Sequence, residues 1–282
     1  MKTRIITAVV GIALLIPLLI FFDTYAFVAG MAFLSMVGCF EMLRVEDLHK
    51  NYFFSVPILL LAGFVPFSVR CWGLEILPYV LPLLLAVLLY ALLMMVLCYG
   101  KRDVHGVGAA FMGCLYVIAG FSAMVAIPDN YGLPDLALVF VGAWVTDTFA
   151  YFSGRLFGKH KLIPAVSPKK TVEGSLGGML FCVIGFFVWG LLYYRDDLSA
   201  LGRPETLLFL IVGGLLASVV SQIGDLSMSV FKRQQGIKDF GKLFPGHGGV
   251  LDRFDSTLAV AVAMLIFLLL GTRVTYLNFI GF

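Results

Sequence analysis

Residues 207–230 read LLFLIVGGLLASVVSQIGDLSMSV, an apolar run with a single charged side chain, Asp225. A helix that crosses a bilayer needs about 20 mostly apolar residues, whereas a strand of a membrane barrel needs only about 10. A helix also satisfies its own backbone hydrogen bonds, which lipid cannot do for it. The run therefore predicts a membrane-spanning helix.

Similar runs recur along the chain, which has 282 residues, 61% of them hydrophobic and only 13% charged. Soluble domains carry about a quarter charged residues, so the apolar excess must face lipid. We predict an all-α, polytopic integral membrane protein with about nine transmembrane helices. The expected spans lie near 5–22, 26–43, 53–69, 76–98, 107–127, 135–153, 176–194, 207–230 and 256–274.

The distribution of Lys and Arg predicts the orientation. With nine spans and the N-terminus in the cytoplasm, 16 of the 20 Lys and Arg residues fall on the inner side, as the positive-inside rule requires. Two inner loops, 154–175 and 231–255, are longer than the rest. We interpret residues 1–282 as a single membrane domain, with helices of 1–134 mainly as scaffold and 135–282 as the catalytic portion.

The predicted eighth helix carries a polar face near its inner end. Ser221, Asp225 and Ser229 recur at every fourth residue, and Lys232 follows three residues later, so these side chains share one face of a helix. An ionisable residue within a span usually points into protein or water. The alternative is an interfacial Asp that simply pairs with Lys or Arg.

The predicted sixth helix carries a similar stripe, formed by Trp144, Asp147 or Thr148, Tyr151 and Arg155. These residues lie at helical spacing close to the inner end of the helix. They are candidates for a polar site. An Asp147–Arg155 pair or an aromatic packing face explains them equally well.

The first long loop contains residues 167–174, SPKKTVEG. The adjacent Lys169 and Lys170 suit phosphate or anionic headgroups as flexible point charges. An ordinary positive-inside loop would also carry such lysines. The neighbouring polar residues favour a built site, and these are Ser167, Thr171 and Glu173.

The second long loop, with the residues that flank it, spans 229–255 and reads SVFKRQQGIKDFGKLFPGHGGVLDRFD. Its glycines allow backbone N–H groups to turn inward and bind an anion. Asp252 and Asp255 are three residues apart and can face one point on a helix, and carboxylates are ligands that suit Mg²⁺. Asp255 also fits as the N-cap of a ninth helix ahead of Ser256 and Thr257.

His247 is the one histidine of this loop. It can be a general base, a phosphate donor or a packing residue. A second His or Cys at metal spacing is missing, so we do not expect zinc. Carboxylates for a divalent ion, cations for phosphate and glycines for close backbone approach together indicate phosphoryl or nucleotidyl transfer.

The segment 229–255 resembles the signature of phosphatidate cytidylyltransferases, also called CDP-diacylglycerol synthases. The pattern is S-x-x-K-R, then K-D, then P-G-H-G-G-x-x-D-R-x-D, and every one of these positions is met. The resemblance implies that CTP and phosphatidic acid give CDP-diacylglycerol and pyrophosphate. It further implies Mg²⁺ on Asp225 and Asp252, a monovalent cation such as K⁺ nearby and a homodimer. The enzyme would lie in the plasma membrane of a bacterium, with its active site on the cytoplasmic side.

The site residues that we expect fall into three groups, and nucleic acid is not an expected partner. The catalytic candidates are Asp225, Asp252, Lys232, Arg253 and His247. The substrate-binding candidates are Lys169, Lys170, Ser167, Thr171, Glu173, Arg233, Lys238, Asp239, Gly248, Gly249, Asp147, Arg155 and Ser229. The metal candidates are Asp225, Asp252 and Asp255.

Other functions fit parts of the sequence. A transporter also has many spans and intramembrane carboxylates, but here the charges crowd at the inner ends of the helices rather than near the midplane. A CTP-dependent lipid kinase is the nearest enzymatic rival. A CDP-alcohol phosphotransferase is disfavoured because its D-G-x-x-A-R pattern is absent. A structural membrane scaffold leaves both polar loops unexplained.

Overall fold

The computed structural model describes residues 13, 16–97, 104–193, 203–246 and 248–280. Among these residues, seven helices are long and apolar enough to cross a membrane. They are α2 (Tyr25–Val45), α3 (Tyr52–Trp72), α5 (Val104–Asn130), α6 (Leu133–Phe157), α7 (Val172–Tyr193), α8 (Pro204–Gln234) and α9 (Leu251–Ile280), of which Leu251–Gly271 is the apolar part.

The predicted fold class, an all-α polytopic membrane protein, is confirmed. A short 3₁₀ turn, η1 (Gly73–Ile76), leads into α4 (Leu77–Leu97), whose segment Pro82–Leu97 is also apolar. The predicted first span near 5–22 lies largely outside the described residues. The count of nine spans and the cytoplasmic N-terminus therefore stay predictions.

The two long loops are shorter than expected. The helix α6 continues to Phe157 and α7 begins at Val172, so both helices extend about three residues into the loop expected near 154–175. Similarly, α8 continues to Gln234 and α9 begins at Leu251. Hydropathy ends a span where polar residues begin, but a helix can continue into water because its backbone bonds are internal.

A two-stranded hairpin, which we did not predict, occupies the first loop. The strands β1 (Lys161–Ile163) and β2 (Ser167–Thr171) pair antiparallel, with Lys161 opposite Thr171 and Ile163 opposite Ser167. The N–H of Val166 bonds to the carbonyl of Ile163 at 3.2 Å. Pro164 follows Ile163 and presets the backbone for this tight turn.

The chain divides into two compact units. The first comprises Met1–Gly132 and Gln234–Phe254, and the second comprises Leu133–Arg233 and Asp255–Phe282. The glycine-rich loop therefore belongs with the N-terminal helices. The interpretation of 1–134 as scaffold and 135–282 as the catalytic portion of a single domain stays a prediction.

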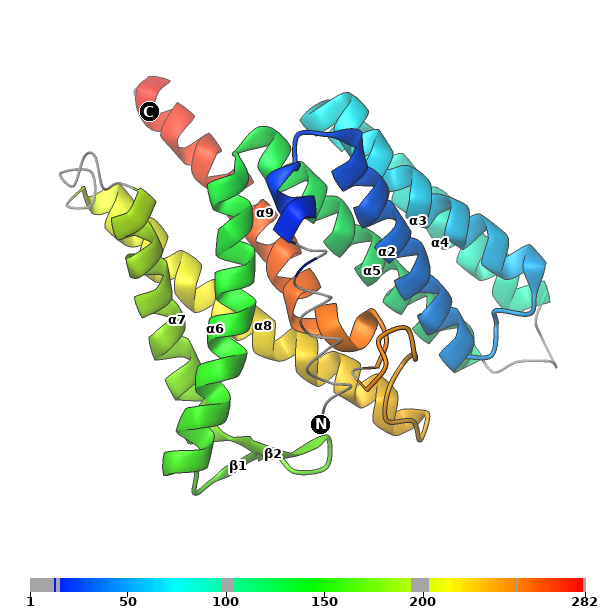
Figure 1. The fold of residues 1–282 in the computed structure, drawn as a ribbon. Coiled ribbons are helices and arrows are strands. Elements are labelled where there is room, and N and C mark those ends of the chain that lie inside the picture. The colour runs from blue at the N-terminus through cyan, green and yellow to red at the C-terminus, as the bar shows by residue number, and fades with distance from the viewer. Residues whose placement is uncertain (1–12, 14–15, 98–103, 194–202, 247, 281–282) are drawn as a thin grey trace. The chain divides into compact units, whose positions relative to one another are not determined.

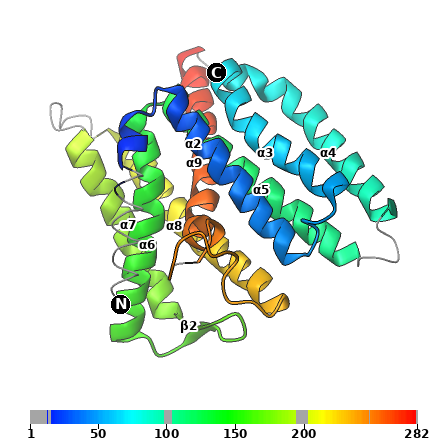
Figure 2. The same cartoon turned by 45° about the vertical axis from the view of Figure 1, so that its right-hand side comes forward.

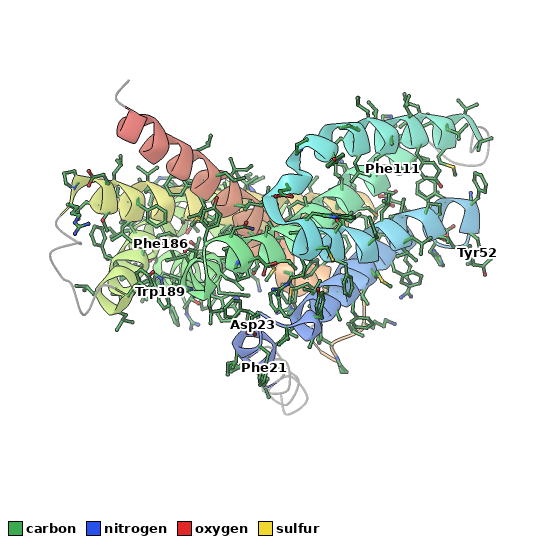
Figure 3. All side chains as sticks on the ribbon, turned by 90° about the horizontal axis from the view of Figure 1, so that it is seen from above. Phe21, Asp23, Tyr52, Phe111, Phe186 and Trp189 are labelled. Atoms are coloured by element: carbon green, nitrogen blue, oxygen red, sulfur yellow. The ribbon has the colours of Figure 1, made fainter. Side chains whose placement is uncertain are left out.

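In the first unit, α2, α3 and α5 pack against one another, and α4 contacts α5 (Figures 1 and 2). The helices α2 and α5 approach closely through small residues. The Sγ of Cys39 lies 3.7 Å from the carbonyl of Cys114, and the Sγ of Cys114 lies 3.7 Å from the carbonyl of Cys39. Close approach of helices through small residues is typical of packing in membranes. Phe111 of α5, labelled in Figure 3, contacts the rings of Phe54 and Tyr90.

In the second unit, α6 and α7 lie side by side (Figures 1 and 2). Gly174 and Gly178 of α7 face α6, where a Cβ on Gly174 would come within 2.6 Å of the carbonyl of Ala150. Phe186, labelled in Figure 3, is buried beside Gly213 of α8. Glycines spaced by four residues let two helices touch through their backbones.

Candidate functional site

The hairpin of the second unit is tied to the last turns of α8. Lys170 of β2 forms an ion pair with Asp225. The Nε of Arg233 donates to the carbonyl of Val166, at the hairpin turn, at 3.3 Å. The Oγ of Ser229 lies 3.5 Å from Oδ1 of Asp225. The structure therefore brings together four of the predicted residues, from two segments more than fifty residues apart.

The two adjacent lysines lie on opposite faces of β2. Successive side chains of a strand alternate between faces, so Lys169 faces away from Asp225 and is exposed. The side chains of Lys170 and Asp225 are each about a quarter exposed, at 25% and 26%. Lys170 thus belongs to a cluster of charged side chains around Asp225, which we call the charge cluster, whereas Lys169 presents its charge to solvent.

The polar residues around these lysines stabilise the local fold. The hydroxyl of Thr171 accepts the N–H of Gly174 at 3.1 Å, which caps the N-terminus of α7. The carboxylate of Glu173 accepts the backbone N–H of Lys159 at 3.1 Å and contacts Nδ1 of His160 at 2.6 Å. Ser167 pairs across the hairpin. Substrate contacts by Ser167, Thr171 and Glu173 stay predictions.

Three carboxylates of the second unit, from three helices, interact electrostatically. The Oγ of Ser256 donates to Oδ2 of Asp147 at 3.0 Å, and its N–H donates to Oδ1 of Asp255 at 2.9 Å. Asp255 in turn is influenced by the charges of Asp225, Lys232 and Asp147. Carboxylates that lie near one another repel, and nearby cationic side chains offset this repulsion. Here Lys232 acts on Asp255 and Lys170 acts on Asp147.

For each of these three carboxylates the sequence left an alternative role open, and the geometry bears on all three. Because α9 begins at Leu251, Asp255 lies inside the helix, and the alternative that it is an N-cap is wrong. The Nη1 of Arg155 donates to the hydroxyl of Tyr151 at 3.1 Å, whereas Asp147 accepts from Ser256. Asp225 does pair with a lysine, as the interfacial interpretation expects, but that lysine is itself a predicted site residue.

In the first unit, Asp252 organises the glycine-rich loop. Its Oδ2 accepts the N–H of Phe240 at 2.7 Å and the N–H of Gly249 at 2.9 Å. Gly248 has φ +88°, and a Cβ there would come within 2.6 Å of the same oxygen. The loop does turn N–H groups inward, and the N–H of Gly249 binds a carboxylate of the protein itself. Phosphate binding through Gly249 therefore stays a prediction.

Glu41 of α2 is a contact residue that our sequence analysis missed. Its two carboxylate oxygens accept the N–H groups of Val250 and Leu251, each at 3.0 Å. It is only 5% exposed. An acidic residue near the end of an apolar run is a sequence signal that could have found it. Its partners could not be predicted, because they lie more than two hundred residues away.

The remaining predicted residues lie on or beside the same loop. Lys238 and Asp239 are exposed in the loop, and Arg253 is exposed in the first turn of α9. Lys232 is half-buried in the last turn of α8. His247 lies outside the described residues, so its predicted catalytic role is not addressed by the structure.

Carboxylate oxygens are the donors that Mg²⁺ prefers, so the chemistry of the donor set fits the expected ion. Among the residues that the structure describes, no group of three or more His, Cys, Asp or Glu side chains is placed to hold a metal. Mg²⁺ normally uses one or two carboxylates and takes its other ligands from substrate phosphates and water. The sharing of one ion by Asp225 and Asp252 stays a prediction.

The sequence of the chain is similar to that of known proteins, and this similarity shows its family. The model of the cytidylyltransferase family matches residues 2–270. The chain is 33% identical over 265 residues to the phosphatidate cytidylyltransferase of Staphylococcus haemolyticus (strain JCSC1435), covering 92% of this chain and 96% of that protein. It is 34% identical over 266 residues, with the same coverage, to the phosphatidate cytidylyltransferase of Staphylococcus aureus (strain COL).

The chain therefore belongs to the cytidylyltransferase family. The match extends over nearly the whole length of both chains, so it includes the N-terminal helices as well as the motifs of the second half. This confirms the resemblance that the segment 229–255 carries, and it makes the chain a nucleotidyltransferase.

Proposed function

We propose that this protein transfers CMP from CTP to phosphatidic acid, giving CDP-diacylglycerol and pyrophosphate. The observation that carries the proposal is the match, over 92% of the chain, to proteins named phosphatidate cytidylyltransferase. The membrane-spanning helices suit a lipid substrate. The charged residues that end α8 and form the hairpin suit the phosphates of a nucleotide.

The reaction is an in-line displacement. A phosphate oxygen of phosphatidic acid attacks the α-phosphorus of CTP, the bond between the α-phosphorus and its bridging oxygen breaks, and pyrophosphate leaves with the electron pair. The attacking oxygen is already ionised at neutral pH, so the step needs no strong general base. The protein's contribution is to position the two substrates and to offset their negative charge.

Cationic side chains support the second of these tasks. Lys170 and Lys232 belong to the charge cluster of the second unit, whereas Lys238 and Arg253 are exposed on the glycine-rich loop and the first turn of α9. Arg233 already holds the hairpin turn through its Nε. In our proposal these groups bind phosphate oxygens, with Lys170 exchanging its carboxylate partner for a substrate phosphate.

Mg²⁺ is part of the proposal, with the carboxylates of Asp225, Asp252 and Asp255 as candidate ligands. When bound, the ion would neutralise charge on the triphosphate and on the leaving pyrophosphate. The protein's residues orient these carboxylates: Ser229 and Lys170 contact Asp225, and the N–H groups of Phe240 and Gly249 hold Asp252. A nearby monovalent cation such as K⁺ stays a prediction from the resemblance.

We further propose that the enzyme lies in the plasma membrane of a bacterium, with its active site facing the cytoplasm, and that it is a homodimer. The relatives named above are bacterial, and the excess of Lys and Arg on the predicted inner side supports this orientation. CTP would reach the site from the cytoplasm, while the lipid would reach it from the bilayer.

The function can be tested on purified protein in detergent or vesicles by measuring pyrophosphate release from CTP. We expect release only when both phosphatidic acid and Mg²⁺ are present, with one CDP-diacylglycerol formed for each pyrophosphate. Release that does not depend on phosphatidic acid would contradict the proposal. A transporter would bind its substrate without any such product.

A further inference from the structure

The carboxylate of Glu41 contacts the start of α9. The N–H groups of Val250 and Leu251 are among those that a helix cannot satisfy internally at its N-terminus. Both residues are fully buried, and the two oxygens of Glu41 accept one N–H each at 3.0 Å. A carboxylate also interacts favourably with the positive end of a helix dipole.

The glycine-rich loop is shaped around this carboxylate. A Cβ on Gly241 would come within 2.1 Å of Oε1 of Glu41, and a Cβ on Gly249 would come within 2.2 Å of the same oxygen. Any larger residue at either position would therefore displace Glu41 or the loop. Two glycines of the family signature region thus serve the close approach of an acidic side chain from α2.

The same turn also holds Asp252. Three successive N–H groups, those of Gly249, Val250 and Leu251, are divided between two carboxylates: Asp252 accepts the first, and Glu41 accepts the other two. Asp252 reaches back in addition to the N–H of Phe240 at 2.7 Å. If Glu41 were lost, two buried N–H groups would need a new acceptor, and Asp252 already bonds to their neighbour.

We infer that Glu41 is a positioning residue for Asp252. By taking the N–H groups of Val250 and Leu251, it leaves the N–H groups of Gly249 and Phe240 to Asp252, and these two bonds direct the carboxylate of Asp252. The inference rests on the proposed function, in which Asp252 is a candidate Mg²⁺ ligand. It assigns to α2, in the half expected to be mainly scaffold, a role in the reaction.

The variant Glu41→Gln tests this role. Gln has one acceptor oxygen, and its amide NH₂ would face a backbone N–H, so one of the two bonds must be lost. The matched control is Glu46→Gln. Glu46 follows the same helix and is 8% exposed, but its partner is the Nε2 of Gln235, at 3.0 and 2.9 Å, which can still donate to the oxygen of Gln.

Two kinds of measurement separate positioning from a merely structural contact. The first is steady-state kinetics, in which Glu41→Gln should lower kcat roughly 10-fold or more and raise the Mg²⁺ concentration for half-maximal rate, with little change in the KM for CTP. The second is amide hydrogen exchange without metal or substrate. In Glu41→Gln, the N–H groups of Phe240 and Gly249 should lose protection together with those of Val250 and Leu251, whereas in Glu46→Gln these four groups should be at least as protected as in the wild type.

The inference is overturned if Glu41→Gln loses protection only at Val250 and Leu251 while its Mg²⁺ dependence is unchanged. If Glu41→Gln does not fold, Gly241→Ala replaces it, because the added Cβ would displace the intact carboxylate of Glu41. A normal Mg²⁺ dependence of Gly241→Ala would also overturn the inference. In the wild type, the four N–H groups should exchange as one group, and independent exchange of the two pairs would overturn the inference. Failure of the proposed function is distinguishable, because the wild type itself would then show no CMP transfer.

Discussion

Lys170 and Asp225 form an ion pair that joins the β-hairpin to α8. The two residues belong to separate motifs of the sequence, and the pair shows that these motifs meet within the second unit. Replacing Lys170 by Met keeps an unbranched side chain, shorter by one atom, and removes its charge. We expect CMP transfer to fall roughly 10-fold to 100-fold, because phosphate binding loses a charge-assisted contact and Asp225 loses its counter-charge.

The control for this variant is Lys161→Met on the other strand of the same hairpin, where the side chain is exposed. Initial rates with saturating phosphatidic acid and varied CTP provide the measurement. Equal rates for Lys170→Met and Lys161→Met would remove Lys170 from the site.

Asp225→Asn keeps the size of the side chain and an acceptor for Ser229, but it removes the negative charge. If Asp225 is a Mg²⁺ ligand, activity should fall more than about 100-fold, a larger loss than that expected for a residue that only supports a ligand. The control is Asp47→Asn, where φ is +54° and Asn is well tolerated. Residual activity near that of Asp47→Asn at low Mg²⁺ would show that Asp225 is not a ligand.

Asp252→Asn should separate folding from catalysis. The amide oxygen of Asn can still accept the N–H groups of Phe240 and Gly249, so the loop should keep its shape. We expect the thermal unfolding midpoint to change little while CMP transfer is nearly abolished. Lys50→Ala, at an exposed position away from the motifs, should be close to the wild type in both measurements. Substantial activity in Asp252→Asn would contradict the predicted metal role.

Thr171 provides a test of the local fold. Its hydroxyl caps α7 through the N–H of Gly174, so Thr171→Val should destabilise the protein by about 1 kcal/mol. Thr171→Ser retains the hydroxyl and should recover most of that loss. The comparison of the two unfolding midpoints in the same detergent decides the matter. If Val and Ser behave alike, the hydroxyl does not stabilise the helix.

Glu46 predicts a pH dependence of stability. Its burial raises the pKa of the carboxyl above the ordinary 4.5, and the hydrogen bond from Gln235 partly lowers it. A raised folded-state pKa means that stability is fully present below pH 4.5 and is lost as pH rises through the folded value. Glu46→Gln should therefore gain stability relative to the wild type over this interval and keep that gain at higher pH. A wild type that instead gains on the variant as pH rises would contradict this assignment.

Sequence reasoning succeeded where the signal is local. Runs such as 207–230 predicted helices because the bilayer demands about 20 apolar residues, and the hydrophobic pattern carries that demand directly. The charged side of α8 was also predicted, since Asp225 and Ser229 are one helical turn apart. The hairpin was missed because three to five residues of strand in a polar loop give little periodicity.

Sequence reasoning failed where the partner is distant. The ninth span was predicted to begin near 256, where the apolar run begins, but the helix α9 begins at Leu251, whose N–H donates to Glu41. No pattern within the loop could reveal an acceptor on α2. Likewise, Lys169 and Lys170 looked equivalent until the strand placed them on opposite faces.

The central claim is the transfer of CMP from CTP to phosphatidic acid, and the fate of labelled phosphate tests it most directly. Purified protein is incubated with phosphatidic acid, Mg²⁺ and CTP labelled at either the α- or the γ-phosphorus, and the lipid is then separated from the aqueous phase. The account predicts that α-label appears in the lipid and γ-label appears in pyrophosphate. Lipid labelled from the γ-position, with CDP released, would contradict the account and indicate a CTP-dependent lipid kinase.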